Sequence, residues 1–172
     1  RPRAGQGVLI LRTAFPAQDE ALKDLVIYAA PGIRRLTVID ASRLPSLAPS
    51  VSPPVGGFAI ASTGKRGHWF RVAYDKAGRE GWVEARRTWR FSRWDDFLVG
   101  RSAALFPDTR HAMATLRPAP SDDAPSLGSV LPDQRFRIVE TRGGWIRVSG
   151  GNGLTGWLRW QDRNGKLLIA VE

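Results

Sequence analysis

The sequence contains no cysteine, two histidines and no long apolar segment. Without cysteine the chain has no disulfides, thiolate nucleophile or thiolate metal site. His68 and His111 have no ligand-spaced acidic cluster around them, so we expect no metal. The longest apolar run, Leu25 to Ala30, is far shorter than the roughly 20 residues of a membrane-spanning helix. We therefore predict no transmembrane segment.

The motifs of common enzymes are also missing. No Gly-x-Ser-x-Gly elbow is present. The adjacent acid pairs Asp95-Asp96 and Asp122-Asp123 would point apart in an extended chain, whereas a general acid and base must face one substrate. Residues 151–156 satisfy Gly-x-Gly-x-x-Gly, but a strand-like Gly-Trp-Leu follows rather than the helix a dinucleotide requires. The sequence therefore predicts neither an enzyme nor a cofactor.

Positive charge is abundant. Among the 172 residues, 26 Lys and Arg, of which 22 are Arg, stand against 16 Asp and Glu, which gives a formal net charge of +10. Such an excess favours an anionic partner, namely nucleic acid, an acidic glycan or an anionic membrane surface. An Arg-rich composition can also reflect a GC-rich genome, which needs no partner.

An internal repeat is the most informative feature. Trp69-Phe70-Arg71-Val72 precedes Gly81-Trp82-Val83, and Trp145-Ile146-Arg147-Val148 precedes Gly156-Trp157-Leu158 at nearly the same spacing. We therefore predict three regions: an N-terminal extension over 1–24, a first module over 25–99 and a second over 100–172. The first module would carry a proline-bearing insertion within 33–57 and an Arg/Trp-rich connector.

Both modules show the short, alternating runs typical of β-strands, separated by turn residues. The predicted strands are 25–29, 58–62, 68–74, 79–85, 114–117, 135–141, 145–149, 154–159 and 166–171. Asp19 and Lys23, at i,i+4 spacing, indicate one short helix in the extension. The stretch 45–57, with four prolines, is predicted to be a loop.

The turns fix the expected hairpin register. A turn over 75–78 pairs Tyr74 with Arg79, which places Arg71 opposite Trp82 and Trp69 opposite Glu84. A turn centred on Asn152 places Ile146 opposite Leu158, Arg147 opposite Trp157, and Trp145 opposite Arg159. Each module would thus stack an Arg on a Trp, either for local stability or as part of an aromatic platform for a peptide or glycan. The candidate ligand-binding residues are Tyr28, Trp69, Arg71, Trp82, Trp145, Arg147 and Trp157.

The repeat resembles the bacterial Src-homology-3-like (SH3-like) family. The motif is Trp-x-Arg-Val, a hairpin and Gly-Trp-Val or Gly-Trp-Leu, after a strand ending in Ala-Pro-Gly or Ala-Pro-Ser. Residues 112–170 match throughout, whereas residues 25–85 depart from the family at the insertion. The resemblance implies all-β modules, each a five-stranded sheet bent into a partial barrel. It also implies a periplasmic or envelope location, with any signal peptide removed upstream of Arg1, and non-catalytic binding of peptidoglycan or a peptide or protein partner.

Two alternatives stay open. The connector segment interleaves aromatic and basic residues, as single-strand nucleic-acid binders do, although it could instead be an arm packed between modules. Its candidate patch is Arg86, Arg87, Trp89, Arg90, Arg93 and Trp94. The other alternative is a structural or docking module of a larger assembly.

Overall fold

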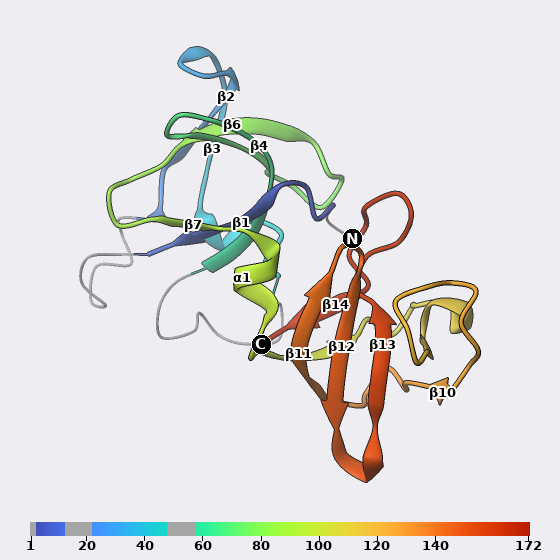
Figure 1. Cartoon of the computed structure of the whole chain (residues 1–172). Coiled ribbons are helices and arrows are strands. Elements are labelled where there is room, and N and C mark those ends of the chain that lie inside the picture. Colours follow the sequence, from blue (N-terminus) through green and yellow to red (C-terminus); the bar gives the residue numbers. More distant parts are fainter. Residues whose placement is uncertain (1–2, 13–21, 48–57) are drawn as a thin grey trace. The chain divides into compact units, whose positions relative to one another are not determined.

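The computed structural model describes residues 3–12, 22–47 and 58–172, and the chain forms two compact units, Arg1–Trp94 and Asp95–Glu172 (Figure 1). Both units consist almost entirely of antiparallel strands, which confirms the predicted all-β, SH3-like fold class. None of the helices in the described ranges is long and apolar enough to span a membrane. We refer to the two parts as unit 1 and unit 2.

Unit 1 contains one seven-stranded sheet in the order β3-β2-β6-β5-β4-β1-β7. Its strands are β1 (Gly7–Leu11), β2 (Leu25–Ala30), β3 (Ile33–Ile39), β4 (Phe58–Arg66), β5 (Trp69–Ala73), β6 (Glu80–Glu84) and β7 (Arg90–Ser92). A 3-10 helix, η2 (Ala41–Arg43), follows β3, and a short helix, α1 (Trp94–Leu98), follows β7. The sheet buries an apolar face that includes Ile27, Ile60, Phe70, Val72 and Val83.

Unit 2 contains a five-stranded sheet in the order β13-β12-β11-β8-β14, together with the separate pair β10-β9. Its strands are β8 (Ser102–Leu105), β9 (Thr115–Leu116), β10 (Gly128–Ser129), β11 (Phe136–Arg142), β12 (Trp145–Gly150), β13 (Thr155–Arg159) and β14 (Ile169–Val171). Two 3-10 helices lie between its strands: η3 (His111–Met113) precedes β9, and η4 (Gly151–Gly153) joins β12 to β13. Ile138, Ile146, Val148 and Leu158 are fully buried in its core.

The strand pairings of the two units correspond one to one. In unit 1, β1 lies between β4 and β7, and in unit 2, β8 lies between β11 and β14. The meander β4-β5-β6 matches β11-β12-β13, and the hairpin β2-β3 matches β9-β10. The pairing that joins the hairpin to the meander also recurs. Tyr28 on β2 pairs with Trp82 on β6, and Arg117, just after β9, pairs with Trp157 on β13.

The predicted hairpin registers are confirmed at every position named above. Arg71 lies opposite Trp82, and Arg147 lies opposite Trp157. Short turns that contain glycine at both hairpins leave little freedom in how the strands align. The apolar and polar residues therefore alternate across the sheet as the sequence pattern requires.

Several strands were not expected from the sequence. Strands β1, β7, β8 and β10 are short, and β3 occupies the first part of the proposed 33–57 insertion, so the insertion is not wholly a loop. The N-terminal extension contributes β1 to the sheet rather than remaining outside the module. The predicted helix around Asp19, and most of the predicted loop, lie outside the described residues.

Candidate functional site

Three aromatic side chains lie on the outward face of the unit 1 sheet. Trp69 and Trp82 come from the hairpin β5-β6 and Tyr28 comes from β2, and all three are half-buried. Tyr28 meets Trp69 edge to face, with 5.4 Å between ring centroids and 89° between the planes. Aromatic pairs prefer this geometry. We call these three residues the aromatic face.

Strands β2 and β6 can lie close together because residue 81 is a glycine. Gly81 precedes Trp82 on β6, and a Cβ atom there would lie 2.3 Å from Ile27 Cγ2 and 3.1 Å from the Tyr28 carbonyl oxygen. Any larger residue would therefore push β2 away from β6. The glycine of the Gly-Trp motif thus allows Tyr28 to lie beside Trp82.

Cations border the aromatic face in an arrangement that differs from the prediction. The guanidinium of Arg66, at the end of β4, lies 5.4 Å from the Trp82 ring centroid. Arg71, the residue predicted to stack there, instead donates to Thr63 Oγ1 at 3.2 Å and pairs with Glu80 at 3.2 Å. Arg66, which belongs to no predicted site, is therefore the cation against Trp82.

In unit 2 the Arg that lies against Trp157 also differs from the predicted one. Arg142 lies 5.3 Å from the Trp157 ring centroid, and Arg159 lies 4.5 Å from that of Trp145. Arg147 pairs with Glu140 at 3.0 Å. Arg142 and Arg66 occupy equivalent positions, because each pairs with the first Trp of its hairpin across the turn.

Unit 2 differs from unit 1 in how far its tryptophans are covered. Trp145 and Trp157 are 8% and 7% exposed. The connection from β9 to β10 spans 117–127, whereas Pro31 and Gly32 alone join β2 to β3. The longer loop is tied down at Asp122, which accepts hydrogen bonds from Arg159 at 2.9 and 2.5 Å and from Arg163 at 3.2 Å. The predicted ligand residues of unit 2 thus do not form an open platform.

Asp122 is held in its ionised form by these contacts. The hydrogen bonds from Arg159 are the largest cause that lowers the pKa of Asp122 from 3.8 to about 2; burial opposes them, and the hydrogen bond from Arg163 adds a smaller lowering effect. Hydrogen bonds from cations favour the charged carboxylate.

Replacing Asp122 with asparagine should therefore lower stability in a pH-dependent way. A carboxylate with a depressed folded-state pKa stabilises the fold above its unfolded pKa, and this contribution is lost as the pH falls. Because the side chain is 38% exposed, solvent screening limits the expected loss to about 1 kcal/mol at pH 7. Urea denaturation of the wild type and Asp122→Asn should show the two curves converging between pH 4 and pH 2. A difference that persists unchanged at pH 2 would contradict this assignment.

The basic connector patch is only partly a surface. Arg86, Arg87, Arg90 and Arg93 are exposed, but Trp89 and Trp94 are 6% exposed. Trp89 packs in the unit 1 core, and Trp94 Nε1 donates to the Ala4 carbonyl oxygen at 2.8 Å. These indoles therefore cannot stack on nucleic-acid bases as that alternative required.

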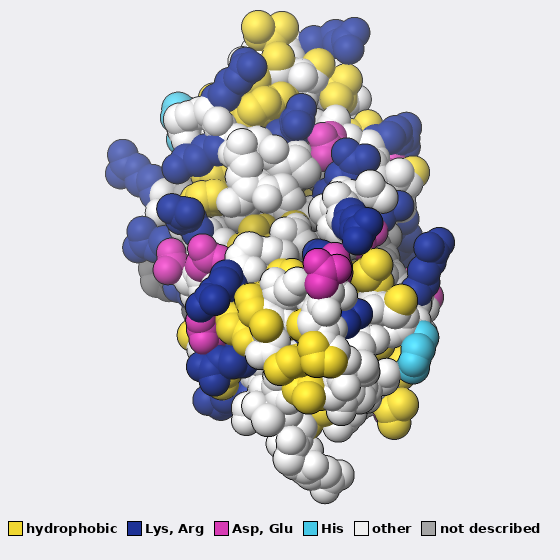
Figure 2. Space-filling model, turned by 45° about the vertical axis from the view of Figure 1, so that its right-hand side comes forward, with side chains coloured by type: hydrophobic (Ala, Val, Ile, Leu, Met, Phe, Trp, Pro, Cys, Tyr) yellow, Lys and Arg dark blue, Asp and Glu magenta, His cyan; other side chains and the backbone are white. Residues whose placement is uncertain are grey.

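Net charge is concentrated in one unit. Residues 1–94 carry 16 Lys and Arg against 7 Asp and Glu, while residues 95–172 carry 10 against 9. Lys and Arg side chains are spread over much of the face drawn in Figure 2, and acidic ones are fewer.

Within the described ranges, no cluster of three or more His, Asp or Glu side chains could hold a metal ion.

The fold and its aromatic hairpins define a small all-β module. Residues 113–162, which make up most of unit 2, match the family model of the bacterial SH3 domain, and this confirms the predicted resemblance for that segment. SH3 domains are binding domains, so this segment is similar to a class of binding module.

Other comparisons add little. Among solved structures, NlpC1 from Trichomonas vaginalis is similar at 12% sequence identity and a TM-score of 0.33. The alignment covers 94% of this chain and 49% of that one, so this chain spans about half the length of NlpC1. A search of curated proteins finds no significant match.

Proposed function

We propose that the protein is a non-catalytic binding protein of the bacterial cell envelope, and that the aromatic face of unit 1 contacts the ligand. The ligand we favour is peptidoglycan, through its stem peptides, or a peptide segment of a protein partner. One observation carries the proposal: Tyr28, Trp69 and Trp82 lie half-exposed on one face, with Arg66 against Trp82. Rigid aromatic rings beside a cation suit an extended peptide with carboxylates.

Unit 1 is, in this proposal, a second copy of the SH3 module. The matching strand order supports this relationship. The equivalent strand pairings at Trp82 and Trp157 support it as well, as do the equivalent cations Arg66 and Arg142. The copies would have divided their roles. Unit 2 retains the family sequence but covers its tryptophans, and unit 1 has lost much of the sequence pattern but leaves its aromatic residues open.

The charge of unit 1 supports an anionic ligand. Carboxylates of a peptidoglycan stem peptide would be attracted by its cationic excess, and Arg66 and Arg71 border the aromatic face directly. Bacterial SH3 domains often occur in envelope proteins, which is consistent with such a ligand. The fit of aromatic surface and charge points to unit 1 rather than unit 2.

Co-sedimentation with purified sacculi tests this function. The full chain should pellet with sacculi at low salt, and added stem peptide should compete. Retention should weaken moderately with salt, because the expected contact combines aromatic stacking with a few charges. A protein that stays in the supernatant at low ionic strength would exclude the wall-binding form.

Nucleic acid is the second candidate, supported by the exposed Arg86, Arg87, Arg90 and Arg93. With the neighbouring indoles buried, such binding would rest mainly on phosphate contacts. Affinity for single-stranded DNA should then fall steeply with salt, by roughly one power of salt concentration per neutralised phosphate. No gel shift at low ionic strength would eliminate this candidate.

A further inference from the structure

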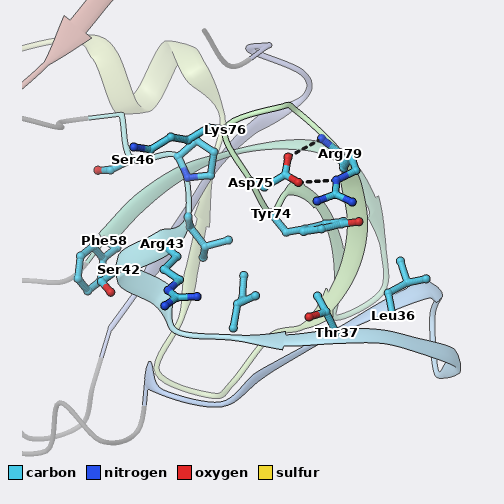
Figure 3. Close-up of a pocket in the computed structure, with 13 residues that line it drawn as sticks. Leu36, Thr37, Ser42, Arg43, Ser46, Phe58, Tyr74, Asp75, Lys76 and Arg79 are labelled. Carbon is cyan, nitrogen blue, oxygen red and sulfur yellow. Dashed lines mark hydrogen bonds and ion pairs between the residues drawn. The ribbon is translucent and has the colours of Figure 1, made fainter.

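Unit 1 has a second concave surface, at the opposite end of the hairpin β5-β6 from the aromatic face. It is a pocket of about 940 Å³, bounded by β3, η2, the start of β4 and the β5-β6 turn (Figure 3). The lining residues used below are Leu36, Ile39, Arg43, Leu44, Phe58, Tyr74, Asp75, Lys76 and Arg79. Its size falls in the range of pockets for small ligands, about 300–1,000 Å³.

The interior of the pocket is partly apolar. Ile39, Leu44, Phe58 and the ring of Tyr74 line it, and Leu36 closes one side while remaining 40% exposed. Figure 3 shows Phe58 and Tyr74 on opposite sides of the same hollow. Partly exposed aliphatic and aromatic side chains grouped in a concavity favour an apolar ligand group.

The rim carries the polar groups, and they are predominantly positive. Asp75 is already satisfied, since it accepts the Arg79 backbone N–H at 3.0 Å and Arg79 Nε at 2.5 Å. The Arg79 guanidinium also lies 5.6 Å from the Tyr74 ring centroid (Figure 3). The Asp75–Arg79 pair therefore forms a nearly neutral part of the rim.

Two cations of the rim remain available. Arg43 and Lys76 are exposed, and neither makes an ion pair with any residue in the described part of the chain. Asp40, the nearest other carboxylate along the chain, accepts the Ser42 backbone N–H at 2.8 Å as the cap of η2. An apolar hollow with two unpaired cations on its edge is complementary to an anion attached to an apolar body.

We propose that this pocket binds a small amphipathic carboxylate, with its aliphatic or aromatic part against Leu36, Phe58 and Tyr74 and its carboxylate between Arg43 and Lys76. The proposal does not depend on the function assigned to the aromatic face. Strands rise about 3.4 Å per residue, so Trp69 lies roughly 17 Å from Tyr74 along β5, whereas Trp82 lies roughly 10 Å from Arg79 along β6. Trp69 is therefore the residue of the aromatic face that tests the two surfaces separately.

NMR titration of the full chain tests the proposal, with sodium octanoate as the probe and octanamide as its uncharged match. Octanoate should shift the amide resonances of residues 36–46 and 74–79 and leave that of Trp69 unchanged. Octanamide should bind the same residues about tenfold more weakly, because it lacks the charge. Equal affinities for the two probes, no shifts at millimolar octanoate, or shifts confined to the aromatic face would each overturn the proposal.

Charge reversal at the rim gives a second, independent measurement. Arg43→Glu combined with Lys76→Glu should weaken octanoate binding about tenfold, since each screened ion pair accounts for up to about a fivefold effect. Octanamide binding should not change. The matched control is Arg87→Glu combined with Arg90→Glu, which makes the same change in net charge away from the pocket lining and should leave both probes unaffected. Equal losses in the control and the rim variant would show that only overall charge matters and would contradict a specific site.

Discussion

Trp69→Ala is expected to lower the affinity of the protein for sacculi, or for the stem peptide, about thirtyfold. Buried aromatic anchors at binding surfaces typically account for 2 kcal/mol or more when truncated. Trp69 provides such an anchor, because Tyr28 supports it edge to face and its solvent side is open. Fold stability should change little in comparison, since the core of this hairpin is formed by Phe70, Val72 and Val83 on the opposite face.

The matched control is the equivalent tryptophan position in the covered unit. Trp145→Ala removes a side chain that is 8% exposed and packs under Arg159, so it should destabilise unit 2 by about 3–5 kcal/mol. The ligand affinity of the molecules that remain folded should be unchanged. Isothermal titration of both variants, together with their urea denaturation curves, separates the two effects. If Trp145→Ala weakens binding and Trp69→Ala does not, the ligand site belongs to unit 2.

The hairpins were the part of the fold most accessible to prediction. Their register depends on local features, namely short turns and strict alternation, so Arg71 could be placed opposite Trp82 from the sequence alone. The division between buried Phe70 and outward Trp69 follows from the same alternation. Local information therefore predicted which face each residue occupies.

The covering of that face depends on contacts between distant residues. Trp145 and Trp157 are buried, and Arg159, which lies 4.5 Å from the Trp145 ring centroid, is held by Asp122 of the 117–127 loop, 37 positions away. The alternation of apolar and polar residues along β12 and β13 gives no information about such a loop. Strands β1 and β7 were missed for a related reason, since each is short and is defined mainly by its partner.

One signal in the sequence could have identified the stacking cations. Arg66-Gly67-His68-Trp69 and Arg142-Gly143-Gly144-Trp145 share the pattern Arg-Gly-x-Trp. The glycine adopts a positive φ in both turns, +58° at Gly67 and +56° at Gly143, so a tight turn sets the Arg directly across from the Trp. The Arg then reaches the second Trp of the motif, on the neighbouring strand.

The Gly-Trp glycines should be the least replaceable residues of the motif. Gly81→Ala places a Cβ atom 2.3 Å from Ile27 Cγ2, so β2 or β6 must shift, and we expect a loss of about 2–3 kcal/mol in the free energy of unfolding. Because Tyr28 would move away from Trp82, binding at the aromatic face should fall as well. Gly151→Ala is the control: no atom lies within 4 Å of a Cβ there and its φ is not positive, so both urea denaturation and ligand affinity should match the wild type. A Gly81→Ala protein with unchanged stability and affinity would mean that the pairing of β2 with β6 does not position the aromatic face.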